Sequence, residues 1–75
     1  MAMPEEAQFL VASALAYAER RGGRLRALTV GGDNPELLHH LKKQLRTAGL
    51  ADVEIHFDPE GDNLRLVAVE VESTP

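Results

Sequence analysis

Histidine and carboxylate side chains are the residues of this sequence that could bind a metal ion. Glu36 and His39 stand three positions apart, which places them on one face of a helix with the Glu-x-x-His spacing that bundle proteins use to hold two metals. Such a site needs two copies of the pair, and the sequence has one. His40 follows His39 directly, so on a helix the two imidazoles diverge by about 100°. We therefore predict no preorganised metal site and keep Glu36, His39 and His40 as weak candidate ligands.

His56 lies in a segment of alternating apolar and polar residues, between Glu54 and Asp58. In a strand these three side chains share one face. Two carboxylates and an imidazole could hold a metal weakly, or they could simply form a solvated acidic face. We favour the solvated face and keep His56 as a fourth weak metal candidate.

A glycine-containing turn, residues 31–34, stands between a predicted strand and a predicted helix, where phosphate-binding loops present backbone N–H groups. It matches no dinucleotide or P-loop pattern. Asp33 and Glu36 also place negative charge where an anion would bind. An ordinary turn with a helix cap is the better interpretation.

Nucleophilic catalysis finds no support in the sequence. There is no cysteine, and the serines and threonines have no evident base beside them in the predicted elements. We predict that the chain is not an enzyme and needs no cofactor.

Two segments have the composition of helices. The first, residues 4–21, begins with Pro4 and two acidic residues and is followed by two glycines, as helix termini favour. The second begins after a cap at Asp33 or Asn34 and ends at Gly49. Its apolar residues recur at steps of three and four, which predicts this buried stripe: Leu38, Leu41, Leu45 and Ala48.

Three segments are predicted strands: residues 24–30, 52–58 and 64–72, with a turn at 59–63. The expected fold class is α/β, an α+β two-layer arrangement in the order α-β-α-β-β, with a three-stranded mixed sheet and both helices on one face. The first two strands should be parallel, and a final hairpin should add an antiparallel strand. We expect one small domain over residues 1–75, with 73–75 as a flexible tail.

The second face of this sheet is covered by nothing in the chain. If the alternating valines at 67, 69 and 71 face the helices, Leu66, Ala68 and Glu70 face the open side. Uncovered apolar residues mark an interface. These three residues are the predicted interface.

Size and charge favour self-association. A 75-residue chain without cysteine buries a limited core, and oligomerisation is a common source of added stability. The net charge of −4 divides into +2 over residues 1–49 and −6 over residues 50–75. This polarity suits a basic partner surface or a second copy, although a solvated acidic hairpin also explains it. The negative charge and the small number of aromatic residues, three, disfavour nucleic acid as a partner. No apolar run approaches the ~20 residues of a membrane span. We therefore expect a cytoplasmic protein without a membrane partner.

Short strings spread over nearly the whole chain are similar to those of one known family: Met3-Pro4-Glu5, Thr29-Val30-Gly31, Asn34-Pro35-Glu36-Leu37-Leu38, Val53-Glu54-Ile55 and Gly61-Asp62-Asn63-Leu64-Arg65-Leu66. They resemble the nickel-chaperone proteins of hydrogenase maturation, the HypA/HybF family. The resemblance implies that the chain has the scaffold of the nickel-binding domain. A second resemblance, to small sulfur-carrier proteins of the TusA type, ranks lower because the sulfur-bearing Cys-Pro motif is missing.

Two departures from the HypA/HybF pattern bear on function. The family's N-terminal Met-His-Glu supplies a nickel ligand, and here Pro4 stands at the histidine position. The four-cysteine zinc module is replaced by the short segment 58–63. The resemblance therefore implies a scaffold that has lost both metal sites.

We accordingly predict a non-catalytic protein-interaction module that associates with itself and binds an unidentified protein partner through the open sheet face or the acidic hairpin. The first alternative is a metallochaperone-like accessory protein with a non-standard site at His39, His40 or His56. A nucleic-acid adaptor using the arginines of residues 20–26 ranks third.

Overall fold

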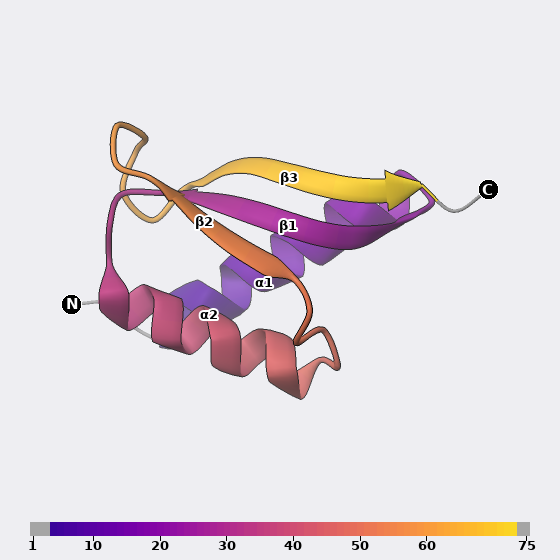
Figure 1. The fold of residues 1–75 in the computed structure, drawn as a ribbon, viewed down its shortest axis with the longest axis horizontal. Coiled ribbons are helices and arrows are strands. Elements are labelled where there is room, and N and C mark those ends of the chain that lie inside the picture. Colours follow the sequence, from indigo (N-terminus) through magenta and orange to yellow (C-terminus); the bar gives the residue numbers. More distant parts are fainter. Residues whose placement is uncertain (1–3, 74–75) are drawn as a thin grey trace.

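A computed structural model of the chain describes residues 4–73. The predicted fold class is confirmed: two helices pack against a three-stranded mixed sheet and share one core with a single face of it (Figure 1). The elements are α1 (Pro4–Arg20), β1 (Gly23–Gly31), α2 (Pro35–Thr47), β2 (Glu54–Asp58) and β3 (Leu66–Ser73). Met3 of the family resemblance, and residues 74–75 of the predicted tail, lie outside the described residues. Ser73, predicted to belong to that tail, is the last residue of β3 and pairs with Gly23.

Helix α2 begins at a side-chain cap. Asn34 Oδ1 accepts hydrogen bonds from the backbone N–H groups of Glu36 and Leu37, at 3.1 and 3.2 Å. This settles the choice between Asp33 and Asn34 as the cap.

The buried stripe of α2 differs from the prediction. It consists of Leu37, Leu41 and Leu45, whereas Leu38 is half-buried at its side and Ala48 is exposed. Both leucine sets fit a helical period, so the choice depends on where α1 and the sheet approach the helix.

The strand order is β2-β1-β3, with β1 in the centre. Leu28 of β1 pairs with Ile55 of β2 in a parallel ladder and with Val69 of β3 in an antiparallel one. The predicted final hairpin is therefore wrong in its pairing, because β3 lies beside β1 and not beside β2. The chain crosses the end of β1 to get there, and Gly31 N–H donates to the Arg65 carbonyl at 2.8 Å.

A register shift in β3 reverses the predicted facing of its first residues. Thr29 pairs with Ala68 and Val30 with Leu66, so that Val67 is an extra residue, 45% exposed. Leu66 consequently packs against the core, and the prediction that it faces the open side is wrong.

Candidate functional site

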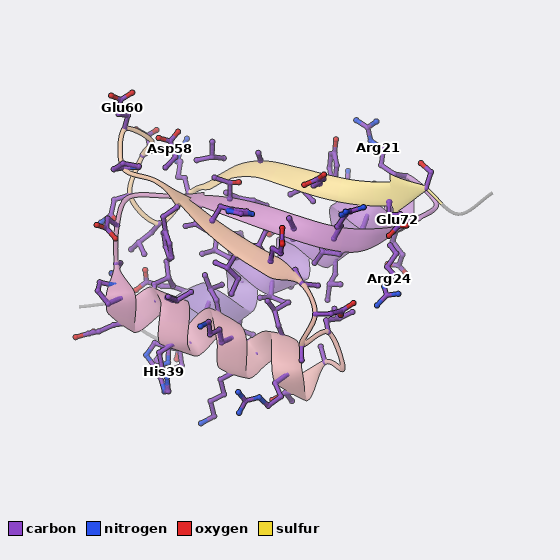
Figure 2. The ribbon with its side chains drawn as sticks, viewed as in Figure 1. Arg21, Arg24, His39, Asp58, Glu60 and Glu72 are labelled. Atoms are coloured by element: carbon purple, nitrogen blue, oxygen red, sulfur yellow. The ribbon has the colours of Figure 1, made fainter. Side chains whose placement is uncertain are left out.

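The histidines and acids proposed as metal ligands are not brought together. Among residues 4–73, no three His, Asp or Glu side chains lie close enough to hold one ion. His39 and His40 contact each other edge to face, with ring centroids 5.7 Å apart. His39 is exposed on α2 (Figure 2), and His40 is half-buried. His56 lies on β2, where its Nε2 is 3.4 Å from Glu54 Oε2. The His39–His40 pair on α2 and His56 on β2 therefore do not combine into one site.

The turn that precedes α2 is occupied by the protein itself. The Asn34 side chain uses two of the N–H groups at the helix terminus, and Gly32 N–H donates to the Asp58 carbonyl at 2.8 Å. The segment after β2 also lies directly against Gly31, since a Cβ built there would overlap the Asp62 carbonyl oxygen. The backbone donors of Gly32, Glu36 and Leu37 are thus engaged within the chain, which supports a structural turn.

The open face of the sheet is small and polar. The pairing places Ala27 of β1 between Glu54 and Glu70, and Thr29 between His56 and Ala68. Ala68 and Glu70 of the predicted interface are exposed on this face, whereas Leu66 is not part of it. Without Leu66, Ala68 is the one apolar residue of the predicted interface that lies on this face.

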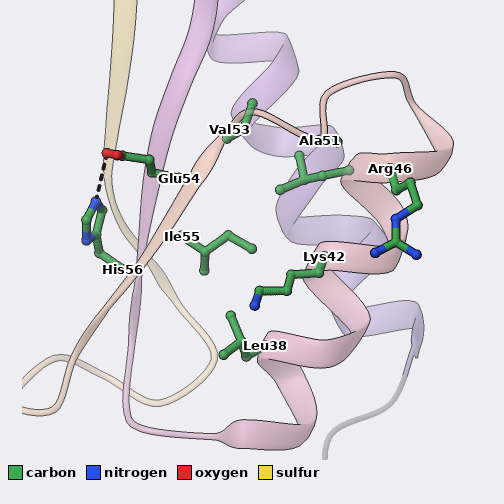
Figure 3. A pocket seen from close by; sticks show the side chains of 9 residues that line it. Leu38, Lys42, Arg46, Ala51, Val53, Glu54, Ile55 and His56 are labelled. Atoms are coloured by element: carbon green, nitrogen blue, oxygen red, sulfur yellow. Dashed lines mark hydrogen bonds and ion pairs between the residues drawn. The ribbon is translucent and has the colours of Figure 1, made fainter.

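An open groove with a volume of about 490 Å³ runs between α2 and β2. Its apolar lining comes from α2, from β2 and from the loop that joins them: Leu38, Leu45, Ala51, Val53 and Ile55. Figure 3 shows Ile55 directed toward α2, with Glu54 and His56 on the other side of the strand. Lys42 and Arg46 form the rim on the helix, and no ion pair is shown for either within the described chain. An apolar lining with a basic rim makes this groove the candidate site of the described residues.

Comparison with known proteins leaves the family open. No protein-family model, curated protein or solved structure matches the chain. The likeness to the HypA/HybF family therefore stays a hypothesis that rests on the short strings quoted above. In the described part of the chain, neither helix is long and apolar enough to cross a membrane.

The sequence by itself did not indicate this groove. It requires Leu38 to leave the core stripe and β2 to lie at the edge of the sheet, and neither fact is local to one element. The one relevant signal in the sequence was the alternation of apolar and polar residues over 53–57, because it predicts a strand with one face against the core.

Metal titration tests the metallochaperone alternative. We expect no nickel or zinc affinity tighter than roughly micromolar, because the described residues bring no three candidate ligands together, and one or two imidazoles do not make a rigid site. Calorimetry on tag-free protein should show little heat. A submicromolar site that His39→Ala or His56→Ala abolishes would instead establish the metallochaperone function.

Proposed function

We propose that this chain is a non-catalytic protein-interaction module that associates with itself through the groove between α2 and β2. The observation that carries the proposal is the apolar lining of this groove beside an unpaired strand edge. Exposed apolar concavities and open edges are the surfaces through which proteins bind other chains.

The edge of β2 supports the proposal for a second reason. β2 lies at one side of the sheet, and its outer backbone groups have no strand partner among the described residues. β3 forms the opposite edge, which is interrupted by the extra residue Val67 and carries Glu70 and Glu72. Bulges and repeated charges are devices that prevent strand pairing. β2 has no bulge, and on its exposed face His56 stands between the acids Glu54 and Asp58, so a carboxylate of a second chain has a partner there.

Sizing by light scattering tests self-association. We expect a mass that is a multiple of 8.2 kDa at micromolar concentration and that falls on dilution, because a domain of this size gains stability from burying the groove. Ala68→Lys on the open sheet face should leave this mass unchanged. A constant 8.2 kDa over a wide concentration range would contradict self-association, and a dissociating Ala68→Lys variant would move the interface to the sheet face.

A further inference from the structure

We infer that two copies of this chain join through their β2 strands in an antiparallel pair, with Ile55 opposite Ile55, to form one six-stranded sheet. This inference rests on the proposed self-association and specifies its geometry. It follows from the order of side chains along β2 and the residue before it.

An antiparallel pair centred on Ile55 is self-complementary. Glu54 of each copy lies opposite His56 of the other, so the open face of the joined sheet has two pairs of a carboxylate and an imidazole. On the helix side, Ile55 meets Ile55 and Val53 meets Phe57, so apolar side chains face apolar ones. Glu54 and His56 already approach each other within one chain, at 3.4 Å, which shows that the two groups are compatible neighbours.

The neighbouring registers are less favourable. A shift that centres the pair on His56 places Glu54 opposite Asp58 twice, and a shift to Glu54 places the two Glu54 carboxylates against each other. Sliding one strand by a single residue, so that Ile55 lies opposite His56, instead sets the apolar residues of one copy against the polar residues of the other. Charge and alternation therefore select the pair centred on Ile55.

At each end of the paired strands, two aspartates approach each other. Asp58 of one copy comes nearest to Asp52 of the other, and Asp52 is held in its own chain by Arg24, whose Nη2 lies 2.7 Å from Asp52 Oδ2. This ion pair offsets the repulsion between the two carboxylates.

The groove between α2 and β2 is closed by the same association. Leu38 and Ile55 line it, and a strand added at the edge of β2 would cover their exposed apolar surface with the side chains of the second copy. Lys42 lies beside Ile55 along the groove, so the two-fold axis brings the two Lys42 ammonium groups near each other (Figure 3). An acidic peptide would instead be attracted by Lys42, so this residue distinguishes the two occupants.

Charge-exchanged chains test the pairing of Glu54 with His56. One variant, His56→Glu, carries only acids at the two positions, and a second, Glu54→Lys with His56→Lys, carries only bases. Both positions are exposed, with 68% of the Glu54 and 58% of the His56 side chain accessible, so the monomers should stay folded. Each variant alone should self-associate on the order of tenfold more weakly, because like charges face each other twice. Mixing them should restore a 1:1 dimer, and a mixture that stays monomeric would overturn the inference.

Single cysteines test the register, since the chain has none of its own. On mild oxidation, Ile55→Cys should form a disulfide-linked dimer faster than Glu54→Cys or His56→Cys, whose thiols would not face their own copies. Random collisions would favour the two control positions, because they are the more exposed. Faster cross-linking of either control would overturn the register. Circular dichroism of Ile55→Cys verifies that the variant is folded, and the charge exchange tests the pairing independently.

Lys42→Ala completes the test. Loss of the ammonium groups should leave the dimer unchanged or tighter, and weaker association would overturn the inference in favour of an acidic occupant. If the unmodified chain is monomeric, the proposed function fails together with this inference. If it associates but ignores every change in β2, the inference alone fails.

Discussion

Leu41→Ala is expected to lower the free energy of unfolding by about 2 to 5 kcal/mol, because it removes a fully buried side chain and leaves a cavity. Leu41 is the middle residue of the stripe by which α2 packs into the core. A chain of 75 residues has a total stability of roughly 4 to 11 kcal/mol, so the loss is a large fraction of it. Urea denaturation followed by circular dichroism measures the change.

Lys43→Ala provides the matched control on the same helix. Lys43 is exposed, and its loss should change stability by no more than about 0.5 kcal/mol. Leu38→Ala should fall between the two, since Leu38 is half-buried beside the groove. A Leu38 variant less stable than the Leu41 variant would mean that α2 is rotated from the orientation described.

Gly31→Ala is expected to destabilise the fold by about 3 kcal/mol or more, because its new methyl group would overlap the backbone carbonyl of Asp62. Gly61 crosses at the same place, where a Cβ on Gly61 would lie 3.2 Å from the Gly31 Cα. A backbone carbonyl cannot rotate away as a side chain can, so the crossing segment itself must move. The hydrogen bonds that tie Gly31 to Leu64 and Arg65, at 3.1 and 2.8 Å, would be strained with it.

Gly49→Ala separates this steric effect from the general cost of replacing glycine. Gly49 has a φ of 75° and nothing within 4 Å of a built Cβ, so its substitution should cost about 1 kcal/mol through backbone strain alone. Thermal and urea denaturation of the two variants give the comparison. Equal losses would contradict the close crossing of β1 by the segment between β2 and β3.

The sequence by itself determined the kind and order of the elements. Their ends are set by short-range chemistry, such as the Asn34 side chain that caps α2 and the acids in the first turn of α1. The alternation of residues 53–57 likewise identified β2 and the face that it turns inward. These signals act over a few residues, so the element order and the two-layer architecture could be predicted without knowing how the elements meet.

Only the tertiary structure decided which strand β3 joins. Residues 59–63 look like a hairpin turn, yet β3 pairs with β1, which places the strand with the most buried residues between two neighbours and buries Leu28 and Val30 completely. The same pairing introduces the extra residue Val67 and turns Leu66 into the core. It also leaves β2 at the edge beside α2, where the groove forms. The pairing of strands depends on how much apolar surface the whole sheet buries, and that free energy is shared among residues far apart in the chain. A local sequence pattern therefore could not reveal the candidate site.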